Sequence, residues 1–244
     1  MTATNSTPSG MELLRATDLT KRYGEDAAIA GVTFEAEAGE VLGIVGPNGA
    51  GKTTLLEALA GLIAADLGGV FWLGDALPPS RRKTAMFYLP DGIRPYQDRF
   101  TIEVLNFFAG IYRRSTAEIA RAVIALELQP VLRKRVSALS KGYNRRLLLA
   151  IGLLAPQPVL LMDEPFDGFD LRQTRSIIDV LRKAAGNGRT FLLAIHQLAD
   201  AERVCDRFLL LAGGQIRGIG SLRELRAQAG IPQGSLEEIF LALT

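Results

Sequence analysis

The sequence predicts an α/β fold with a mainly parallel β-sheet and a helical segment inserted in the middle of the chain. Short apolar runs typical of buried parallel strands alternate with segments of helical periodicity. From about residue 91 to 154 this alternation stops, and the consecutive segments all show helical spacing. Because the chain has 244 residues, 48% of them hydrophobic, it is long enough to enclose the core of one large domain.

The order of the elements follows from these patterns. The first ten residues, MTATNSTPSG, have the composition of a disordered tail, so the folded domain is expected over 11–244. Its core is expected at about 11–90 and 155–244, and a helical subdomain at about 91–154. The expected strands are Glu12–Leu19, Ile29–Glu35, Val41–Val45, Val70–Leu73, Met86–Leu89, Val159–Met162, Thr190–Ile195 and Phe208–Leu211. The expected helices are Thr53–Leu62, Thr101–Arg113, Thr116–Leu128, Gly142–Leu154, Leu171–Ala185, Leu198–Cys205 and Ser235–Thr244.

The composition argues against several classes of protein. A formal net charge of +2 gives no reason to expect nucleic acid as a partner. The single cysteine, Cys205, cannot form an internal disulfide, which fits a reducing compartment. No stretch approaches the roughly 18–20 apolar residues of a membrane helix, and the N-terminus lacks the pattern of a secretory signal. The chain is therefore expected to be soluble by itself.

A glycine-rich segment between a predicted strand and a predicted helix fits the phosphate-loop pattern G-x-x-x-x-G-K-[ST]. The residues concerned are Gly46, Pro47, Asn48, Gly49, Ala50, Gly51, Lys52, Thr53 and Thr54. Glycines let backbone N–H groups turn inward on phosphate oxygens, and the following helix presents its positive end to the same anion. Lys52 is expected on the β- and γ-phosphates and the Thr53 hydroxyl on Mg²⁺. The motif indicates a P-loop NTPase, and leaves kinases, GTPases and motors open.

Two carboxylates, Asp163 and Glu164, end the next buried strand. In P-loop folds an acid at such a strand end holds Mg²⁺, which suits Asp163, and a neighbouring carboxylate can polarise the attacking water, which suits Glu164. The alternative is a solvated strand end, which needs both acids exposed because unpaired burial is costly. His196, the only histidine, follows another predicted strand at the edge where open sheets bind ligands, and is a candidate donor to the γ-phosphate.

Taken together, these motifs resemble the nucleotide-binding subunit of an ABC transporter over about residues 13–243. The matching segments are GPNGAGKTT, LSKGY at Leu139–Tyr143 for the signature LSGGQ, Asp163-Glu164-Pro165 for the acidic strand end, Phe166–Asp170 for the D-loop and His196 for the switch histidine. Tyr23 falls where the family stacks an aromatic ring on adenine. The spacing and the ending Leu236–Phe240 resemble the ABC-2 type exporter branch.

The resemblance implies a P-loop NTPase (RecA-like) core with a mainly parallel sheet, an N-terminal antiparallel β-subdomain and an inserted helical subdomain. It also implies an ATPase that uses ATP and Mg²⁺ at the interface of two subunits, most simply a homodimer. Ser140 and Gly142 would cap the γ-phosphate of ATP held by the partner's loop, with Asp170 among the nucleotide-binding residues. Hydrolysis would power export by a separate membrane permease, which places the subunit peripherally at the cytoplasmic face of the plasma (inner) membrane.

Two positions depart from the family pattern. The signature reads LSKGY, so Lys141 brings a positive charge near phosphate and removes a glycine. The glutamine of the Q-loop is missing, and Asp91 stands in its place. An aspartate can still hold Mg²⁺ or water at a shorter reach, so Asp91 joins Thr53 and Asp163 as a predicted metal ligand. Gln97 is the alternative candidate for the Q-loop residue.

Aromatic residues gather in Phe100–Phe108, together with Tyr96 and Tyr112. The resemblance makes this the docking place of a permease helix; the alternative is ordinary core of the helical lobe. The alternative function is a non-transport ABC ATPase acting on ribosomes or DNA, but such proteins carry two cassettes or long coiled coils, which this sequence lacks. An unrelated P-loop kinase is disfavoured by the signature and the D-loop.

Overall fold

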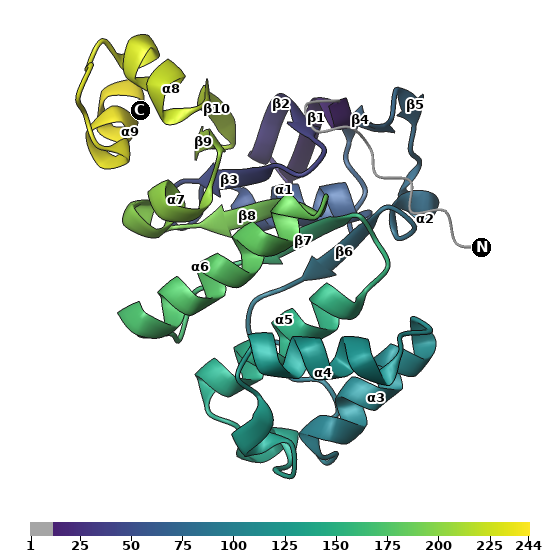
Figure 1. Ribbon diagram of the computed structural model, residues 1–244. Coiled ribbons are helices and arrows are strands. Elements are labelled where there is room, and N and C mark those ends of the chain that lie inside the picture. Colours follow the sequence, from purple (N-terminus) through teal and green to yellow (C-terminus); the bar gives the residue numbers. More distant parts are fainter. Residues whose placement is uncertain (1–11) are drawn as a thin grey trace.

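The computed structural model describes residues 12–244, and the predicted tail at 1–10 lies outside them. Within 12–244 the chain forms a six-stranded sheet, a four-stranded sheet and a lobe of helices. The larger sheet occupies the middle of the molecule, the smaller sheet lies above it and the helical lobe below (Figure 1). The predicted α/β fold class is confirmed.

The large sheet is parallel except at one edge, and its strand order is β10-β9-β3-β8-β7-β6. Its strands are β3 (Val41–Val45), β6 (Met86–Leu89), β7 (Val159–Asp163), β8 (Thr190–Ile195), β9 (Arg207–Ala212) and β10 (Gln215–Gly220). Only β10 runs antiparallel, to β9. Every residue of β3, β7 and β8 is buried, as expected for strands covered on both faces.

The small sheet is antiparallel, in the order β2-β1-β4-β5. Its strands are β1 (Glu12–Tyr23), β2 (Asp26–Glu37), β4 (Leu67–Trp72) and β5 (Asp75–Ala76). Burial alternates along the second half of β2, where Val32, Phe34 and Ala36 point inward, so one face of this sheet lies on the core and the other faces solvent.

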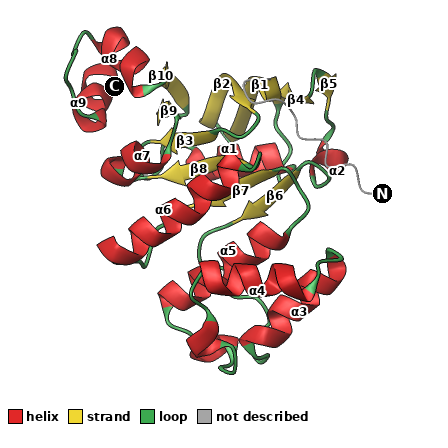
Figure 2. Ribbon diagram, in the orientation of Figure 1, coloured by secondary structure: helices red, strands yellow, loops and turns green. Residues whose placement is uncertain are grey.

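Helices cover the large sheet and build the lower lobe, shown in red in Figure 2. Those of the core are α1 (Lys52–Ala60), α2 (Pro79–Arg82), α6 (Leu171–Gly186), α7 (Leu198–Val204), α8 (Leu222–Ala229) and α9 (Leu236–Leu243). Those of the lower lobe are α3 (Thr101–Ile111), α4 (Thr116–Ala125) and α5 (Lys141–Leu154), with short 3-10 turns at Gln129–Val131 and Val136–Ala138.

Two apolar clusters lie on opposite faces of the large sheet. Strand β3 shows the division, because Val41 and Val45 pack with the lower lobe and α6, whereas Leu42 and Ile44 pack with α1 and the small sheet. Helix α1 therefore lies between the two sheets, with Leu55, Leu56 and Leu59 fully buried, and its N-terminus points out at the carboxyl end of β3.

Several element ends differ from the sequence-based expectation. The helix expected to end at Leu62 ends at Ala60, because Gly61 takes a left-handed backbone (φ +77°) that caps it. The helix expected to reach Arg113 ends at Ile111, and Arg113 is left-handed (φ +54°). The strand β10 and helix α8 were not predicted. The boundaries at 91 and 154 stay a prediction, although α3 to α5 do gather in one lobe.

Candidate functional site

The carboxyl ends of three neighbouring strands bring the predicted site residues together. Strand β8 lies between β3 and β7, with Val45 opposite Ile195 and Asp163 opposite Ala194. The glycine-rich loop follows β3, Glu164 follows β7 and His196 follows β8. These segments are far apart in the sequence, and the register of the parallel sheet places them at one edge.

The glycine-rich loop is held tightly against its surroundings. Gly51, the N-cap residue of α1, has φ +102°, and a Cβ there would lie 2.2 Å from the carbonyl oxygen of Ala28. A Cβ on Gly46 would lie 2.1 Å from the carbonyl oxygen of Leu211. Both contacts are with backbone, which cannot give way easily, so the loop needs glycine at these two positions.

The side chain of Lys52 points into this loop and is buried although it carries a charge. Its side chain is 6% exposed, and Nζ donates to the carbonyl oxygens of Gly46 at 2.7 Å and Pro47 at 3.1 Å. Nζ also lies 4.0 Å from Glu164 Oε1. Burial lowers the pKa of Lys52, and the carboxylates of Glu164 and Asp163 oppose this by raising it. The loop thus places a buried cation beside the N-terminus of α1, an arrangement that suits phosphate.

Thr53 and Asp163 meet beside Lys52. The Thr53 hydroxyl donates to Asp163 Oδ2 at 2.6 Å, and Asp163 is only 5% exposed. The alternative of a solvated strand end with both acids exposed is therefore wrong. Hydroxyl and carboxylate oxygens are ligands that Mg²⁺ accepts, so this pair fits the ion. Among residues 12–244 no group of three or more His, Cys, Asp or Glu is arranged to hold a metal ion.

Glu164 is turned into the site by an unusual backbone. Its φ is +48°, a left-handed conformation that costs a non-glycine residue on the order of 1 kcal/mol, and its N–H donates to the carbonyl oxygen of Ala194 at 3.0 Å. In this position Oε2 lies 2.5 Å from His196 Nδ1. Burial raises the pKa of Glu164, and the hydrogen bond and charge of His196, with Lys52, act in the opposite direction. A carboxylate with a raised pKa beside an orienting histidine suits a general base.

A pocket of about 320 Å³ unites these groups. It is lined by Ala28, Asn48, Gly49, Gly51, Lys52, Thr53, Thr54, Asp91, Asp163 and Glu164. Ala50 of the loop is buried, and its N–H donates to Pro47 O at 3.2 Å within the loop. Asp91 reaches the pocket, and its carboxylate is paired with Arg145 of α5. Sequence reasoning missed Arg145, since nothing distinguishes it from other basic residues on that helix.

Several predicted residues lie outside the lining of this pocket, among them Gly46, Pro47, Ala50, His196, Tyr23 and Gln97. Tyr23 ends β1 with 55% of its surface exposed, and Lys21 Nζ lies 5.6 Å from the centre of its ring. Its contact with adenine stays a prediction. Gln97 is held by its backbone carbonyl, which accepts from Ser137 N–H at 2.9 Å, so Asp91 is the better-placed candidate for the Q-loop position.

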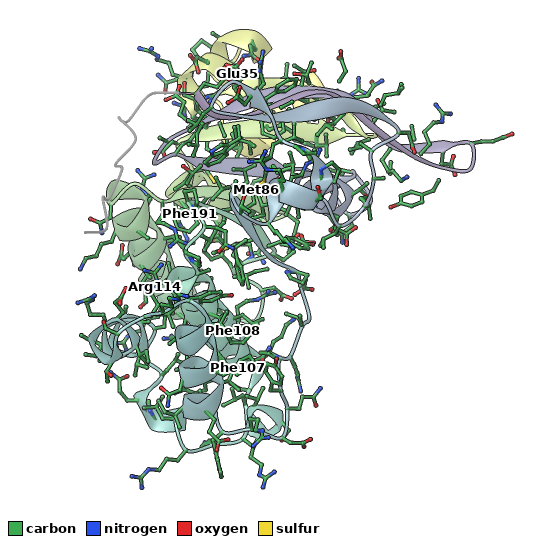
Figure 3. The ribbon with its side chains drawn as sticks, turned by 90° about the vertical axis from the view of Figure 1, so that its right-hand side faces the viewer. Glu35, Met86, Phe107, Phe108, Arg114 and Phe191 are labelled. Atoms are coloured by element: carbon green, nitrogen blue, oxygen red, sulfur yellow. The ribbon has the colours of Figure 1, made fainter. Side chains whose placement is uncertain are left out.

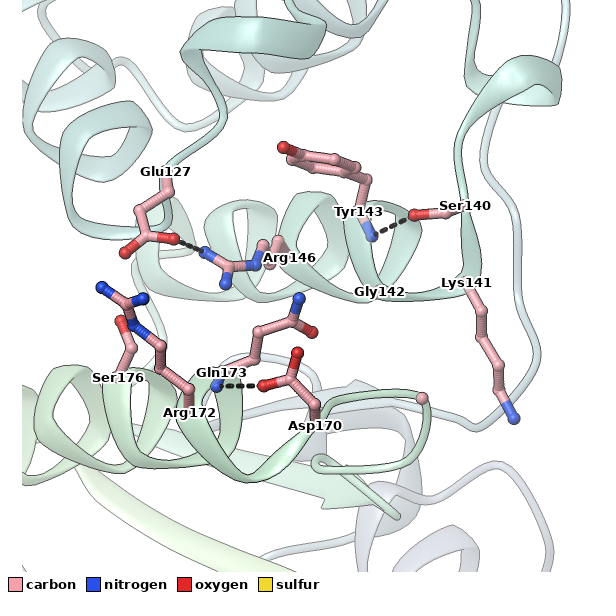
Figure 4. Close-up of a pocket in the computed structure, with 11 residues that line it drawn as sticks. Glu127, Ser140, Lys141, Gly142, Tyr143, Arg146, Asp170, Arg172, Gln173 and Ser176 are labelled. Carbon is pink, nitrogen blue, oxygen red and sulfur yellow. Dashed lines mark hydrogen bonds and ion pairs between the residues drawn. The ribbon is translucent and has the colours of Figure 1, made fainter.

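The signature residues lie on a second pocket, of about 590 Å³, between α5 and α6 (Figure 4). Ser140 is the N-cap residue of α5 and accepts from Tyr143 N–H, and Asp170 caps α6 by accepting from Gln173 N–H at 2.8 Å. A Cβ on Gly142 would lie 3.3 Å from Gly168 O, so the helix start is close to the D-loop. Lys141, although largely exposed, donates from Nζ to Asp167 Oδ2 at 2.5 Å.

The two pockets are built from different residues throughout the described part of the chain. The loop, the acidic strand end and Asp91 line one, and Ser140, Gly142 and Asp170 line the other. Each presents part of what a bound triphosphate needs, because a helix N-terminus is an incomplete anion site without an opposite surface.

Comparison with known proteins decides the family. The family model described as ABC transporter matches residues 29–167, which include the glycine-rich loop, the signature and the acidic strand end. The chain belongs to the ABC transporter family. The ATP-binding protein EcsA of Bacillus subtilis is 30% identical over 240 residues, covering 96% of this chain and 97% of that protein. A fluoroquinolones export ATP-binding protein of Mycobacterium tuberculosis is 34% identical over 238 residues, covering 93% and 78%.

Solved structures agree with this assignment. An ATP-binding subunit of an ABC transporter superposes with a TM-score of 0.85 at 30% identity, covering 95% of this chain and 99% of that one. The ADP conformation of the ATP-binding cassette MJ1267 gives a TM-score of 0.79 at 22% identity, covering 95% and 99%, and supports the fold alone. This ABC ATPase domain is thus a nucleotide-binding, ATP-hydrolysing subunit of a transporter. None of its helices within 12–244 is long and apolar enough to cross a membrane.

Proposed function

We propose that this ABC ATPase pairs with a second copy of itself, closes on two ATP molecules and powers export through a separate membrane permease. The observation that carries the proposal is the division of the nucleotide-binding groups between two pockets of one chain. Relatives named as export ATP-binding proteins for Nod factors and fluoroquinolones support the direction of transport.

The proposed dimer is supported by the fact that each pocket contains only part of the groups that a triphosphate needs. In the pocket of Lys52 a triphosphate would be held from one side, by the loop and the start of α1. In the other pocket, Ser140 and the start of α5 would offer hydrogen-bond donors to an anion, and the residues of the phosphate loop are not part of its lining. Two chains placed face to face would complete both pockets at once, so ATP would act as the adhesive and hydrolysis would release it.

The chemistry is assigned to this chain's own residues. Lys52 and the loop N–H groups would hold the phosphates, and Thr53 and Asp163, with Asp91 nearby, would hold Mg²⁺. Bound Mg²⁺ would offset negative charge on the phosphate oxygens. Glu164 would take a proton from the attacking water, and His196, whose Nδ1 lies 2.5 Å from Oε2, orients that carboxylate and opposes the rise of its pKa.

A permease would dock on the aromatic cluster formed by Tyr96, Phe107, Phe108 and Tyr112. The ring centres of Tyr96 and Phe107 lie 5.2 Å apart, and those of Phe107 and Phe108 lie 5.5 Å apart. Tyr96 and Phe107 are each about half exposed, and Figure 3 shows Phe107 and Phe108 on the lower lobe, far from Glu35 on the small sheet. An exposed aromatic patch of this kind fits a helix of a membrane partner. The subunit would then lie peripherally at the cytoplasmic face of the inner membrane, with no nucleic acid bound.

Isolation of the tagged chain from membranes of its native host tests the proposal. A membrane protein with several spanning helices should co-purify, and Phe107→Glu should lose it while retaining ATP hydrolysis. Leu241→Glu on α9 changes an even more exposed apolar side chain outside the cluster and should retain the partner. Isolation with ribosomes or DNA, and never with a membrane protein, would contradict the proposal.

A further inference from the structure

Arg145 is a buried cation on α5 whose partners lie at the nucleotide pocket. Its side chain is 6% exposed; Nη2 contacts Asp91 Oδ1, and Nη1 lies 3.5 Å from the main-chain oxygen of Asp163. A buried guanidinium without a counter-charge is costly, so these contacts determine how it lies. Because Ser140 caps the same helix, Arg145 joins the signature helix to two walls of the pocket.

Asp91 lines the nucleotide pocket even though its carboxylate is paired with Arg145. Its side chain is 47% exposed and lines the cavity with Lys52, Thr53 and Asp163. The ion pair engages Oδ1, and a carboxylate has about four acceptor positions, so the group retains the capacity to bind a water or a cation in the pocket.

The charge balance of the pocket explains why Arg145 is needed. Asp91, Asp163 and Glu164 bring carboxylates to a cavity that must also receive a triphosphate. The glutamine that the family places at the Q-loop is neutral, whereas aspartate adds a negative charge. Without Arg145, the charge of Asp91 would repel phosphates bound in the same pocket.

The loop that carries Asp91 has a separate anchor. Asn144 Nδ2 donates to the carbonyl oxygen of Ile93 at 2.9 Å, so the backbone after β6 is held to α5 independently of the ion pair. Loss of the Arg145 charge should therefore change the electrostatics and direction of the Asp91 carboxylate more than the path of the loop.

We propose that Arg145 is a positioning residue for Asp91. It neutralises the charge of this carboxylate and fixes its orientation, so that the pocket accepts nucleotide phosphates. It also links the carboxylate to the helix that begins after Ser140. The inference rests on the proposed nucleotide site and adds to it a residue outside the phosphate loop, the acidic strand end and the signature.

Calorimetric titration of the purified chain with ATP, with Mg²⁺ or with EDTA, tests this inference. Arg145→Gln should weaken ATP affinity on the order of tenfold, and most strongly in EDTA, because Asp91 is then uncompensated. Adding Asp91→Asn should restore most of the affinity, a rescue that a purely structural arginine would not show. In steady-state assays Arg145→Gln should raise KM for ATP more than it lowers kcat.

The inference is overturned if the double variant binds no better than Arg145→Gln, or if Arg145→Gln binds as wild type. Should Arg145→Gln not fold, Arg145→Lys replaces it, with a loss of about threefold from its shorter reach and the same rescue by Asp91→Asn.

A matched control is Arg189→Gln, because Arg189 is a partly buried arginine that donates to the Gly152 and Ala155 carbonyls at the other end of α5. It should lower the melting temperature without changing ATP affinity. If neither the wild type nor this control binds ATP, the proposed nucleotide site is wrong. If both bind ATP, the result for Arg145→Gln tests the role of Arg145 separately from the nucleotide site.

Discussion

His196 Nδ1 lies 2.5 Å from Glu164 Oε2, although the two residues follow different strands of the large sheet. An ionised carboxylate can only accept, so Nδ1 carries the shared proton and Nε2 is left for the nucleotide side. The contact opposes the burial that raises the pKa of Glu164. The histidine therefore has a measurable electrostatic task besides any contact with phosphate.

His196→Ala should shift the acid side of the pH–rate profile. The base must be ionised, so turnover is lost as pH falls through the pKa of Glu164. Removing His196 removes an influence that lowers this pKa, so the loss should begin at higher pH, and kcat should fall about tenfold or more. The measurement is kcat from about pH 5 to 9, with His196→Gln as a control that keeps a hydrogen-bond donor. If the acid midpoint of the pH–rate profile is unchanged in His196→Ala, His196 does not influence the pKa of Glu164.

Glu164→Gln should retain ATP binding and lower turnover about 100-fold or more, since the amide cannot take a proton from water. The variant should collect as ATP-bound dimers, seen by size-exclusion chromatography with light scattering. Glu237→Gln, an exposed acid on α9, should behave as wild type. Turnover at the normal rate in Glu164→Gln would exclude the proposed general base.

Lys52→Ala should weaken ATP affinity on the order of 100-fold, because a largely buried ammonium at the phosphate position is replaced by a methyl group. Titration with ATP measures the change. Lys183→Ala removes an exposed lysine of α6 and should leave the affinity as it was. Equal affinities for the two variants would count against the assignment of the phosphate loop.

Gly51→Ala should lower the free energy of unfolding by about 1–3 kcal/mol, because the new Cβ would meet the Ala28 carbonyl in a left-handed backbone. Gly49→Ala is the matched comparison: Gly49 is also left-handed (φ +80°), but a Cβ there meets no atom within 4 Å. Urea unfolding of both variants separates steric clash from backbone strain. A smaller loss for Gly51→Ala than for Gly49→Ala would show that the contact with β2 is unimportant.

Elements with a strong local pattern were predicted well. Strands β3 and β8 have the expected limits, since a strand buried on both faces is a continuous apolar run between breakers. Strand β10 has two glycines and no such run. Helix α8 carries a recognisable start, because Ser221 and Glu224 form a capping box, and that signal could have been used to find it.

By itself the sequence determined the chemistry of the site, because the phosphate loop, Asp163-Glu164 and the signature are contiguous motifs whose spacing encodes their roles. Only the tertiary structure decided which groups act on one another. His196 and Glu164 meet through the strand register, and Arg145 meets Asp91 through the packing of α5 against the loop after β6. The physical reason is that a turn is determined by residues adjacent in the sequence. A buried charge, in contrast, needs a partner, and the partner can come from any segment that the fold places beside it.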